Sequence, residues 1–388
     1  MKKRILFLSA WYPTRYDPMP GLFVKRHAEV MTDTFDVAVL HTFAVESPKK
    51  LYEIDITTEE KLFTVRVYYR KVKIPVPGFS PLIKFLRFLK AHQKGFREIQ
   101  KHYGLPDLVH ANILTRVGLI AFYLKARYGI PYIITEHWSR YLPENFAFTG
   151  TVRKIATRKV VKHSAAISVV SENLQMMMKQ CGIIHPNFYI IKNVVDCNIF
   201  KPLEKPYSDP ILFSHISCFD EKAKNVTGII HAIFELSKHR KDFICQMVGE
   251  GEDKPKAEHL VEQLNLKDFV KFTGLLEGEA LIKAYSRSAF IVLFSNYETM
   301  SVVIAESFAC GRPVIATRVG GIPEIVDVSN GLLITPGDEH ALSKAIDYML
   351  SNSQKYNAEQ IRSFAIGLFS RNAVQAQLTN LYQLALGK

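Results

Sequence analysis

Short apolar stretches alternate with amphipathic stretches along most of the chain. Each apolar block has the length of a strand and is followed by a segment with apolar residues at helical spacing. In the first half, this pattern predicts strands at 4–9, 35–42, 63–73, 107–111, 132–136, 166–170 and 189–191. It predicts helices at 22–31, 81–102, 117–128 and 151–163. Regular alternation of this kind is typical of a doubly wound α/β domain with a parallel sheet.

A second alternating series follows a proline-containing linker at 200–210. Strands are predicted at 211–216, 243–248, 270–272, 289–294, 314–316 and 331–334. Helices are predicted at 226–238, 256–264, 279–286 and 339–350, after Ser301, after Pro323-Glu324, and through the tail 356–386. We therefore expect two α/β domains, 1–200 and 201–365, with a terminal helix at 366–388 that packs back on the first domain.

The length of 388 residues suits two domains, and an apolar content of 48% with 22% charged residues is that of a globular protein. The net charge is uneven: residues 1–200 hold 30 Lys and Arg against 15 Asp and Glu, while residues 201–388 hold 20 against 22. A basic first half predicts an anionic partner for that domain, such as anionic lipid, an anionic acceptor or nucleic acid. A solvated basic surface is the plainer alternative.

The sequence gives little support to other classes of protein, namely membrane-spanning, secreted, metal-binding and nucleic-acid-binding proteins. No apolar run reaches the roughly 18 residues of a spanning helix, and the run after Met1-Lys2-Lys3-Arg4 is read as a first strand and not as a signal peptide. The five cysteines form no CxxC pair, which favours free thiols, a cytoplasmic location and no metal site. Neither a helix-turn-helix nor an RNA-binding motif accompanies the basic charge, so we expect no nucleic-acid partner.

Candidate chemistry concentrates between Ala289 and Val326. Glu298 follows the predicted strand 289–294, and Glu306 lies eight residues later in a helix that Ser301 can cap. Gly320-Gly321 forms a second turn after the next strand. Because ligands bind at the carboxyl ends of strands in open parallel sheets, both glutamates are expected to face one crevice.

These residues resemble family-4 glycosyltransferases, which are retaining, nucleotide-sugar-dependent enzymes of the GT-B fold. The resemblance starts from the two glutamates followed by Ala309-Cys310-Gly311-Arg312-Pro313. Further landmarks occur in the family's order, namely the glycine loop 9–21, Pro106-Asp107-Leu108-Val109-His110, Thr135-Glu136-His137, the segment 191–202 and Val248-Gly249-Glu250-Gly251-Glu252. A single glycine motif would be weak, but ordered landmarks over about residues 5–335 are specific. The resemblance implies two Rossmann-like domains that face each other across a cleft, the first binding the acceptor and the second the nucleotide sugar.

The resemblance also implies roles for individual residues. Glu298 would contact the donor sugar, Glu306 would bind the ribose hydroxyls, and His137 would face the sugar and stabilise charge near it. The candidate ligands of the diphosphate are Lys224, Lys222, Gly21 and the stretch Thr299, Met300 and Ser301. Trp11 and Trp138 could stack on a sugar ring, and Glu324 is expected to be a helix cap. No metal or other cofactor is expected.

Two positions depart from the family pattern. The family's glycine-arginine pair would fall near Ser217-Cys218, which leaves the second phosphate ligand open, and Thr299-Met300-Ser301 stands where Gly-Phe-Gly is common. We expect a front-face mechanism, because the sequence shows no second carboxylate placed as a nucleophile.

The expected partners are a nucleotide-sugar donor, a glycan or lipid-linked acceptor of bacterial surface polysaccharide synthesis, and an anionic membrane surface. The membrane would contact the basic helices near 84–101 and 153–162, beside Phe79, Phe85 and Phe88. A sugar-nucleotide epimerase, a phosphorylase and a nucleic-acid-binding module remain the alternatives.

Overall fold

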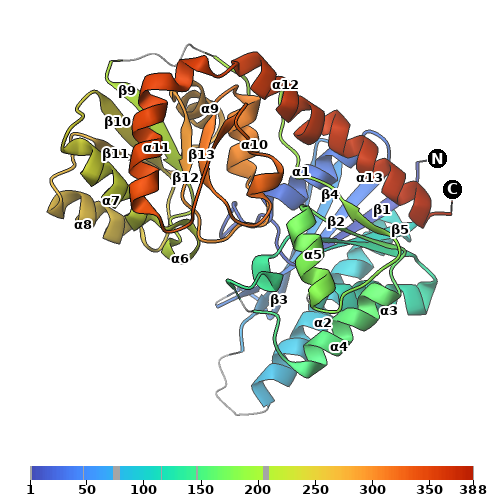
Figure 1. Cartoon of the computed structure of the whole chain (residues 1–388). Coiled ribbons are helices and arrows are strands. Elements are labelled where there is room, and N and C mark those ends of the chain that lie inside the picture. Colours follow the sequence, from blue (N-terminus) through green and yellow to red (C-terminus); the bar gives the residue numbers. More distant parts are fainter. Residues whose placement is uncertain are drawn as a thin grey trace.

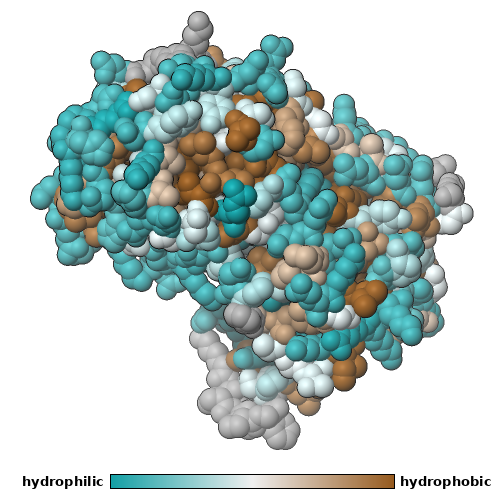
Figure 2. Space-filling model, in the orientation of Figure 1, coloured by the Kyte–Doolittle hydropathy of each residue, from teal (hydrophilic) through white to brown (hydrophobic). Residues whose placement is uncertain are grey.

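The structure is a computed structural model that describes residues 2–46, 48–72, 79–114, 116–145, 147–203 and 209–387, with Phe79 described by its backbone alone. Two α/β domains lie side by side, as the sequence predicts (Figure 1). Residue 73 of the predicted strand 63–73 and residues 204–208 of the predicted linker 200–210 lie outside the described residues. Figure 2 shows a mainly hydrophilic surface, with an apolar area between α11 and α10 of the second domain.

The first domain is built on an eight-stranded sheet in the order β3-β4-β2-β1-β5-β6-β7-β8 within the described residues. The strands are β1 (Arg4–Ser9), β2 (Asp36–Val45), β3 (Tyr52–Glu59), β4 (Leu62–Arg70), β5 (Leu108–Asn112), β6 (Tyr132–Glu136), β7 (Ala166–Val169) and β8 (Phe188–Ile190). The helices are α1 (Leu22–Met31), α2 (Phe79–Tyr103), α3 (Arg116–Tyr128), α4 (Thr151–Lys162) and α5 (Glu172–Gln180). All strand pairs are parallel except β3 with β4.

The second domain holds a six-stranded parallel sheet in the order β11-β10-β9-β12-β13-β14, again within the described residues. Its strands are β9 (Ile211–Ile216), β10 (Phe243–Val248), β11 (Val270–Gly274), β12 (Ile291–Leu293), β13 (Val314–Thr317) and β14 (Gly331–Ile334). Its helices are α6 (Glu221–Lys224), α7 (Val226–Ser237), α8 (Lys254–Gln263), α9 (Gly278–Arg287), α10 (Val302–Ala309) and α11 (Glu339–Asn352).

The last two helices connect the domains (Figure 1). Helix α12 (Ala358–Phe369) packs against α10, while α13 (Arg371–Ala385) buries Val374, Leu378 and Tyr382 against the core of the first domain. Tyr382 also bonds through its hydroxyl to Nδ1 of the buried His110, at 2.7 Å. The terminal helix is therefore part of the first domain's structure.

Local predictions were wrong or incomplete in four places. The four-residue helix α6 was not predicted. Strand β3 was not predicted. It is a half-exposed edge strand in which only alternate residues are shielded. Helix α5 was also missed, although Ser171 caps it and its buried residues Leu174, Met177 and Met178 have helical spacing. The helix expected after Pro323-Glu324 is only a 3₁₀ turn, Ile322–Glu324, because Ile325 and Val326 turn into the core and Asn330 then closes the loop.

Candidate active site

Glu298 and Lys224 lie together at the carboxyl edge of the second sheet. Glu298 follows β12, and Lys224 ends the short helix α6 after β9. The Lys224 ammonium donates to Glu298 Oε2 at 2.7 Å. Burial lowers the pKa of Lys224, but the carboxylate of Glu298 raises it more, so the net shift is upward and the lysine stays charged. The predicted phosphate ligand and the predicted sugar ligand are therefore direct neighbours.

The N-terminus of α10 lies beside this pair. Thr299 donates its backbone N–H to Glu298 Oε1 at 3.1 Å, and Ser301 caps the helix by accepting from the N–H of Ile304. The Met300 side chain is 4% exposed and belongs to the core, so only its backbone can face a ligand. In the described part of the chain, the N–H groups of Met300 and Ser301 donate no hydrogen bond, which leaves them free for an anion.

Gly320 and Gly321 pack against the loop that contains Glu298 and Thr299. Gly320 has a φ of 51°, and a Cβ there would lie 1.6 Å from the carbonyl oxygen of Glu298. At Gly321, a Cβ would clash with Thr299 of the same domain and with Ser171 of the first domain. The two glycines are therefore required for the close packing of the Glu298 loop and for the contact between the domains.

Glu306 lies within α10, eight residues after Glu298, and is 5% exposed. Its Oε1 accepts from Arg26 Nη1 of α1 at 2.9 Å, and its Oε2 accepts from the Tyr285 hydroxyl at 2.8 Å. The predicted ribose ligand thus forms an ion pair across the domain boundary. Ribose hydroxyls would have to share or replace these bonds.

His137 follows β6 of the first domain and is 6% exposed. Its ring lies 4.5 Å from that of Phe23 and 5.7 Å from that of His27, centroid to centroid. Neither ring nitrogen has a hydrogen-bond partner among the described residues, although both are buried. Such an unpaired imidazole is suited to a ligand hydroxyl.

Burial lowers the pKa of His137 well below its ordinary value, and the nearby His27 and His110 lower it further, while the side chain of Asn193 opposes the shift to a smaller extent. The imidazole is therefore neutral near pH 7. As a neutral ring, His137 supplies no positive charge, and any stabilisation of charge near the sugar would come from a hydrogen bond that the ring donates or accepts.

The preceding residue, Glu136, organises the loop that carries His137. Its carboxylate accepts from the backbone N–H groups of Leu114, His137 and Trp138 at 2.9–3.0 Å and from the Tyr141 hydroxyl at 3.2 Å. Burial raises the pKa of this carboxyl. Four donors to one carboxylate fix the loop conformation, so Glu136 is a positioning residue that the sequence did not indicate.

The surroundings of four other predicted site residues point less clearly to a bound ligand. These residues are Lys222, Gly21, Trp11 and Trp138. Lys222 is exposed, and only its backbone carbonyl forms a hydrogen bond in the described residues, with Asn296. Gly21 has a φ of 73° and caps α1, and a Cβ there would lie 2.1 Å from the carbonyl oxygen of Trp11. The rings of Trp11 and Trp138 pack against each other at 5.0 Å, which leaves less aromatic surface for a sugar than expected.

Glu324 links the two domains. It accepts from the N–H of Asn173 at 2.8 Å and from the Lys192 ammonium at 3.0 Å, both in the first domain. Glu324 therefore makes a helix-capping contact, as expected, but not in the 3₁₀ turn to which it belongs. Glu324 instead binds the first turn of α5, a helix that the sequence did not predict. The partners of Arg26 and Glu324 could not be predicted from the sequence, because no local pattern indicates a contact between the two domains.

The chain matches two family models. Residues 25–199 match Glycosyltransferase Family 4, and residues 198–363 match Glycosyl transferases group 1. Together these matches account for both domains in order. The chain belongs to the family-4 glycosyltransferases, and it is a transferase that uses a nucleotide-sugar donor.

Individual proteins agree with this assignment. The MMP alpha-(1->4)-mannosyltransferase of Mycolicibacterium hassiacum is 24% identical over 302 residues, which cover 73% of this chain and 71% of that protein. Sucrose-phosphate synthase from Thermosynechococcus elongatus superposes with a TM-score of 0.79 at 20% identity over 100% of both chains. Anabaena HepE in complex with UDP gives 0.72 at 16% identity over 98% and 99%. The predicted GT-B fold is confirmed.

The described residues offer little for a membrane span or a metal site. No helix in the described residues is long and apolar enough to cross a membrane. The five cysteines are free thiols, and within the described ranges no group of His, Cys, Asp and Glu is arranged to hold a metal ion. Phe88, expected on a membrane-facing surface, is 7% exposed and part of the core, while Leu82 and Leu86 of the same helix are more than half exposed.

Proposed function

We propose that this glycosyltransferase moves a sugar from a nucleoside-diphosphate donor to a glycan or lipid-linked acceptor with retention of configuration. Its expected setting is bacterial surface polysaccharide synthesis, in the cytoplasm and at the inner membrane face. The observation that carries this proposal is the Lys224–Glu298 pair beside the free N-terminus of α10, the helix that also bears Glu306. A diphosphate, a sugar and a ribose each find a ligand of suitable chemistry there.

The diphosphate would be neutralised by Lys224 and by the N–H groups of Met300 and Ser301. A cation and the positive end of a helix both favour a dianion. Cys218, at the family's arginine position, is an exposed thiol and supplies no charge, so more of the neutralisation rests on Lys224, with Lys222 as the second candidate. We propose that these groups act without a metal ion.

Transfer would take place on one face of the donor sugar. The bond from the anomeric carbon to the β-phosphate oxygen breaks while the acceptor hydroxyl adds from the same side. The hydroxyl proton passes to the departing phosphate. In this scheme Glu298 orients the sugar through its hydroxyls, and the unpaired nitrogens of neutral His137 contact a sugar hydroxyl.

Glu306 would bind the ribose by exchanging the Arg26 bond for ribose hydroxyls. Because Arg26 belongs to the first domain, this exchange would couple donor binding to the relative position of the domains. The Tyr285 bond can persist, since it uses the other carboxylate oxygen. HepE has been crystallised with UDP, which makes UDP a suitable first probe.

The proposal is tested with a panel of nucleoside-diphosphate sugars, assayed for release of nucleoside diphosphate with and without EDTA. We expect one donor class to be turned over, equally in EDTA, and turnover to be lost in Glu298→Gln. Nucleoside-diphosphate stabilisation in a thermal shift should be lost in Glu306→Ala. An epimerised nucleotide sugar as the product would instead establish the epimerase alternative. A shift produced by single-stranded DNA alone would establish a nucleic-acid-binding module.

A further inference from the structure

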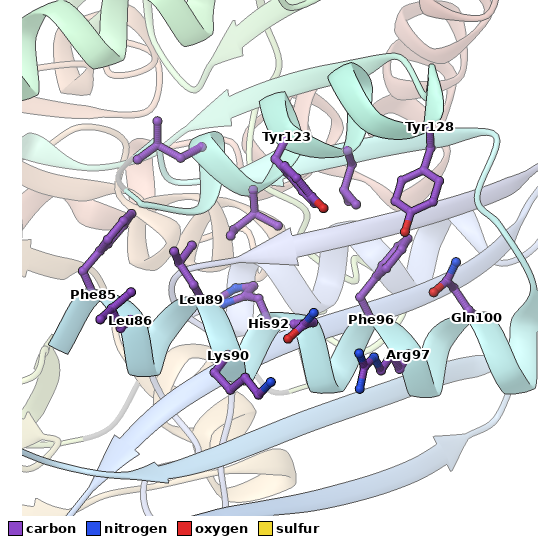
Figure 3. A pocket seen from close by; sticks show the side chains of 14 residues that line it. Phe85, Leu86, Leu89, Lys90, His92, Phe96, Arg97, Gln100, Tyr123 and Tyr128 are labelled. Carbon is purple, nitrogen blue, oxygen red and sulfur yellow. The ribbon is translucent and has the colours of Figure 1, made fainter. Parts of the chain in front are cut away.

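An apolar groove separates α2 from α3 on the first domain. It has a volume of about 660 Å³, and its walls are aromatic and aliphatic, among them Phe85, Leu89, Phe96, Leu119, Tyr123 and Tyr128 (Figure 3). Leu86 and Tyr123 at its rim are 54% and 57% exposed. Lys90 and Arg97 of α2 also line it. The groove follows α2 from Phe85 to Gln100, roughly 22 Å at about 1.5 Å per residue.

A second hollow adjoins the groove at the carboxyl edge of the sheet. It has a volume of about 350 Å³ and is lined by Arg116, Arg140 and Arg153 together with apolar side chains. We call it the arginine pocket. Phe85 and Leu119 line both hollows, so the apolar groove leads directly into the arginine pocket.

Arg140 gives the arginine pocket its specific chemistry. The residue is 3% exposed, its Nε is buried without a partner, and its side chain forms no hydrogen bond with the described residues. It stacks on Trp138, with Cζ 3.4 Å from the ring centroid. Burial lowers the pKa of Arg140, and Glu136 and Tyr141 oppose this shift while Arg153 adds to it.

No acidic residue among those described lines the arginine pocket. The carboxylate of Glu136, which attracts Arg140 electrostatically, already accepts four other hydrogen bonds. Arg140 therefore has only the electrostatic attraction of Glu136 and the Trp138 ring to offset the cost of burying a guanidinium. An anionic ligand would remove that cost, and guanidinium groups bind phosphate oxygens well.

The arginine pocket also lies close to the loop that carries His137, where the donor sugar is proposed to bind. Arg140 lies three residues after His137, on the loop that Glu136 holds in place, while Arg116 and Arg153 lie at the first turns of α3 and α4. A phosphate in the arginine pocket would place its substituent next to the His137 loop. An isolated membrane-binding patch would not need this position.

We propose that the acceptor is a lipid phosphate or diphosphate whose chain lies in the α2–α3 groove and whose phosphate binds Arg116, Arg140 and Arg153. The sugar it carries then extends towards His137. This inference rests on the proposed function, since it names the acceptor class of the same enzyme. It also gives the basic first domain a defined ligand, distinct from a general anionic surface.

The test uses the full chain and its own fluorescence, because the two tryptophans, Trp11 and Trp138, lie 5.0 Å apart and Arg140 covers Trp138. Farnesyl diphosphate is titrated and compared with farnesol and with inorganic diphosphate. We expect farnesyl diphosphate to quench the tryptophan fluorescence in a saturable way. Farnesol and inorganic diphosphate should each bind about tenfold more weakly, or weaker still.

Arg116→Gln and Arg153→Gln alter exposed residues, so these variants should fold. We expect each to weaken farnesyl diphosphate binding by about tenfold. Tyr123→Asp, in the groove, should weaken farnesyl diphosphate but leave inorganic diphosphate unchanged. Lys162→Gln removes one exposed charge from the same helix as Arg153 without altering the arginine pocket, and should bind like the unmodified protein.

Equal binding in the two arginine variants and in Lys162→Gln would overturn the proposal. Equal affinity for inorganic and farnesyl diphosphate would overturn its lipid part. Binding only to phosphatidylglycerol vesicles, unaffected by Arg153→Gln, would show a general membrane surface instead. UDP stabilisation is measured in every variant: its loss throughout would count against the proposed function, whereas its retention beside failed lipid binding would count against the acceptor class alone.

Discussion

Arg26 and Glu306 form a 2.9 Å hydrogen-bonded ion pair between α1 of the first domain and α10 of the second. The carboxylate is nearly buried, and its other oxygen accepts from Tyr285. The residue that is expected to hold the donor ribose therefore also holds the domains together. Under the proposed function, donor binding and domain position would compete for the same oxygen atom.

Replacing Arg26 by Met should destabilise the protein, because it leaves the buried Glu306 carboxylate with one donor fewer. We expect a loss of about 2 kcal/mol in the free energy of unfolding, measured in urea. Lys25→Met on the same helix breaks more exposed pairs with Glu29 and Glu59, and should cost about 1 kcal/mol or less. The double variant Arg26→Met/Glu306→Gln should recover part of the loss. Equal effects of the Arg26 and Lys25 variants would contradict this account.

Lys224→Gln should weaken the binding of UDP much more than that of uridine. The lysine is expected to contact the diphosphate, so its removal should cost about 10- to 100-fold in UDP affinity by calorimetry. Uridine, which lacks phosphates, should bind with unchanged affinity. Lys222→Gln provides the comparison at an exposed neighbouring lysine. A uniform loss for UDP and uridine would show that Lys224 supports the loop and not the phosphate.

Tyr382→Phe should destabilise the first domain although it lies in the last helix. The hydroxyl bonds to His110 at 2.7 Å, and His110 continues to Thr135 and Ser168 through bonds of 2.6 and 2.7 Å. Loss of this buried bond should cost about 1–3 kcal/mol by urea unfolding. Tyr103→Phe is the matched control, because its buried hydroxyl has no partner among the described residues. Similar costs for both variants would argue against a structural role for the Tyr382 bond.

Stability should fall as the pH drops from about 6.5, the ordinary pKa of histidine. Burial lowers the pKa of His27, His41, His92 and His215 to about 4, and it also lowers those of His110 and His137 well below the ordinary value. The unfolded chain therefore binds more protons than the folded chain between pH 6.5 and 4, and unfolding is favoured there. Each histidine contributes about 1 kcal/mol by pH 5.5. Melting temperatures measured from pH 8 to 5 should be steady above pH 7 and decline below 6.5; a flat profile would contradict the depressed pKa values.

Local patterns predicted much of the site. The capping role of Ser301 and the position of Glu298 after β12 follow from residues only a few positions apart, and such short-range rules are read directly from sequence. The same is true of most strands, because fully buried parallel strands are continuous apolar runs. The edge strand β3 is not a continuous apolar run, and it was missed. Helix α5 was missed as well.

Contacts between residues far apart in the chain could not be predicted from the sequence. Arg26 and Glu306 are 280 positions apart, and His110 and Tyr382 are 272 apart. Nothing in the helix 22–31 distinguishes Arg26 from Lys25 as the partner of a buried carboxylate. The neutral state of His137 likewise depends on how deeply the ring is buried, which only the three-dimensional packing determines.

The most direct test of the central claim is the configuration of the sugar that the enzyme releases. With the donor identified in the panel and no acceptor present, slow transfer to water is followed by proton NMR before the free sugar equilibrates. A front-face transfer from an α-linked donor predicts that the α anomer appears first, and that its formation is lost in Glu298→Gln. Early appearance of the β anomer would contradict retention and with it the proposed use of Glu298, His137 and Lys224.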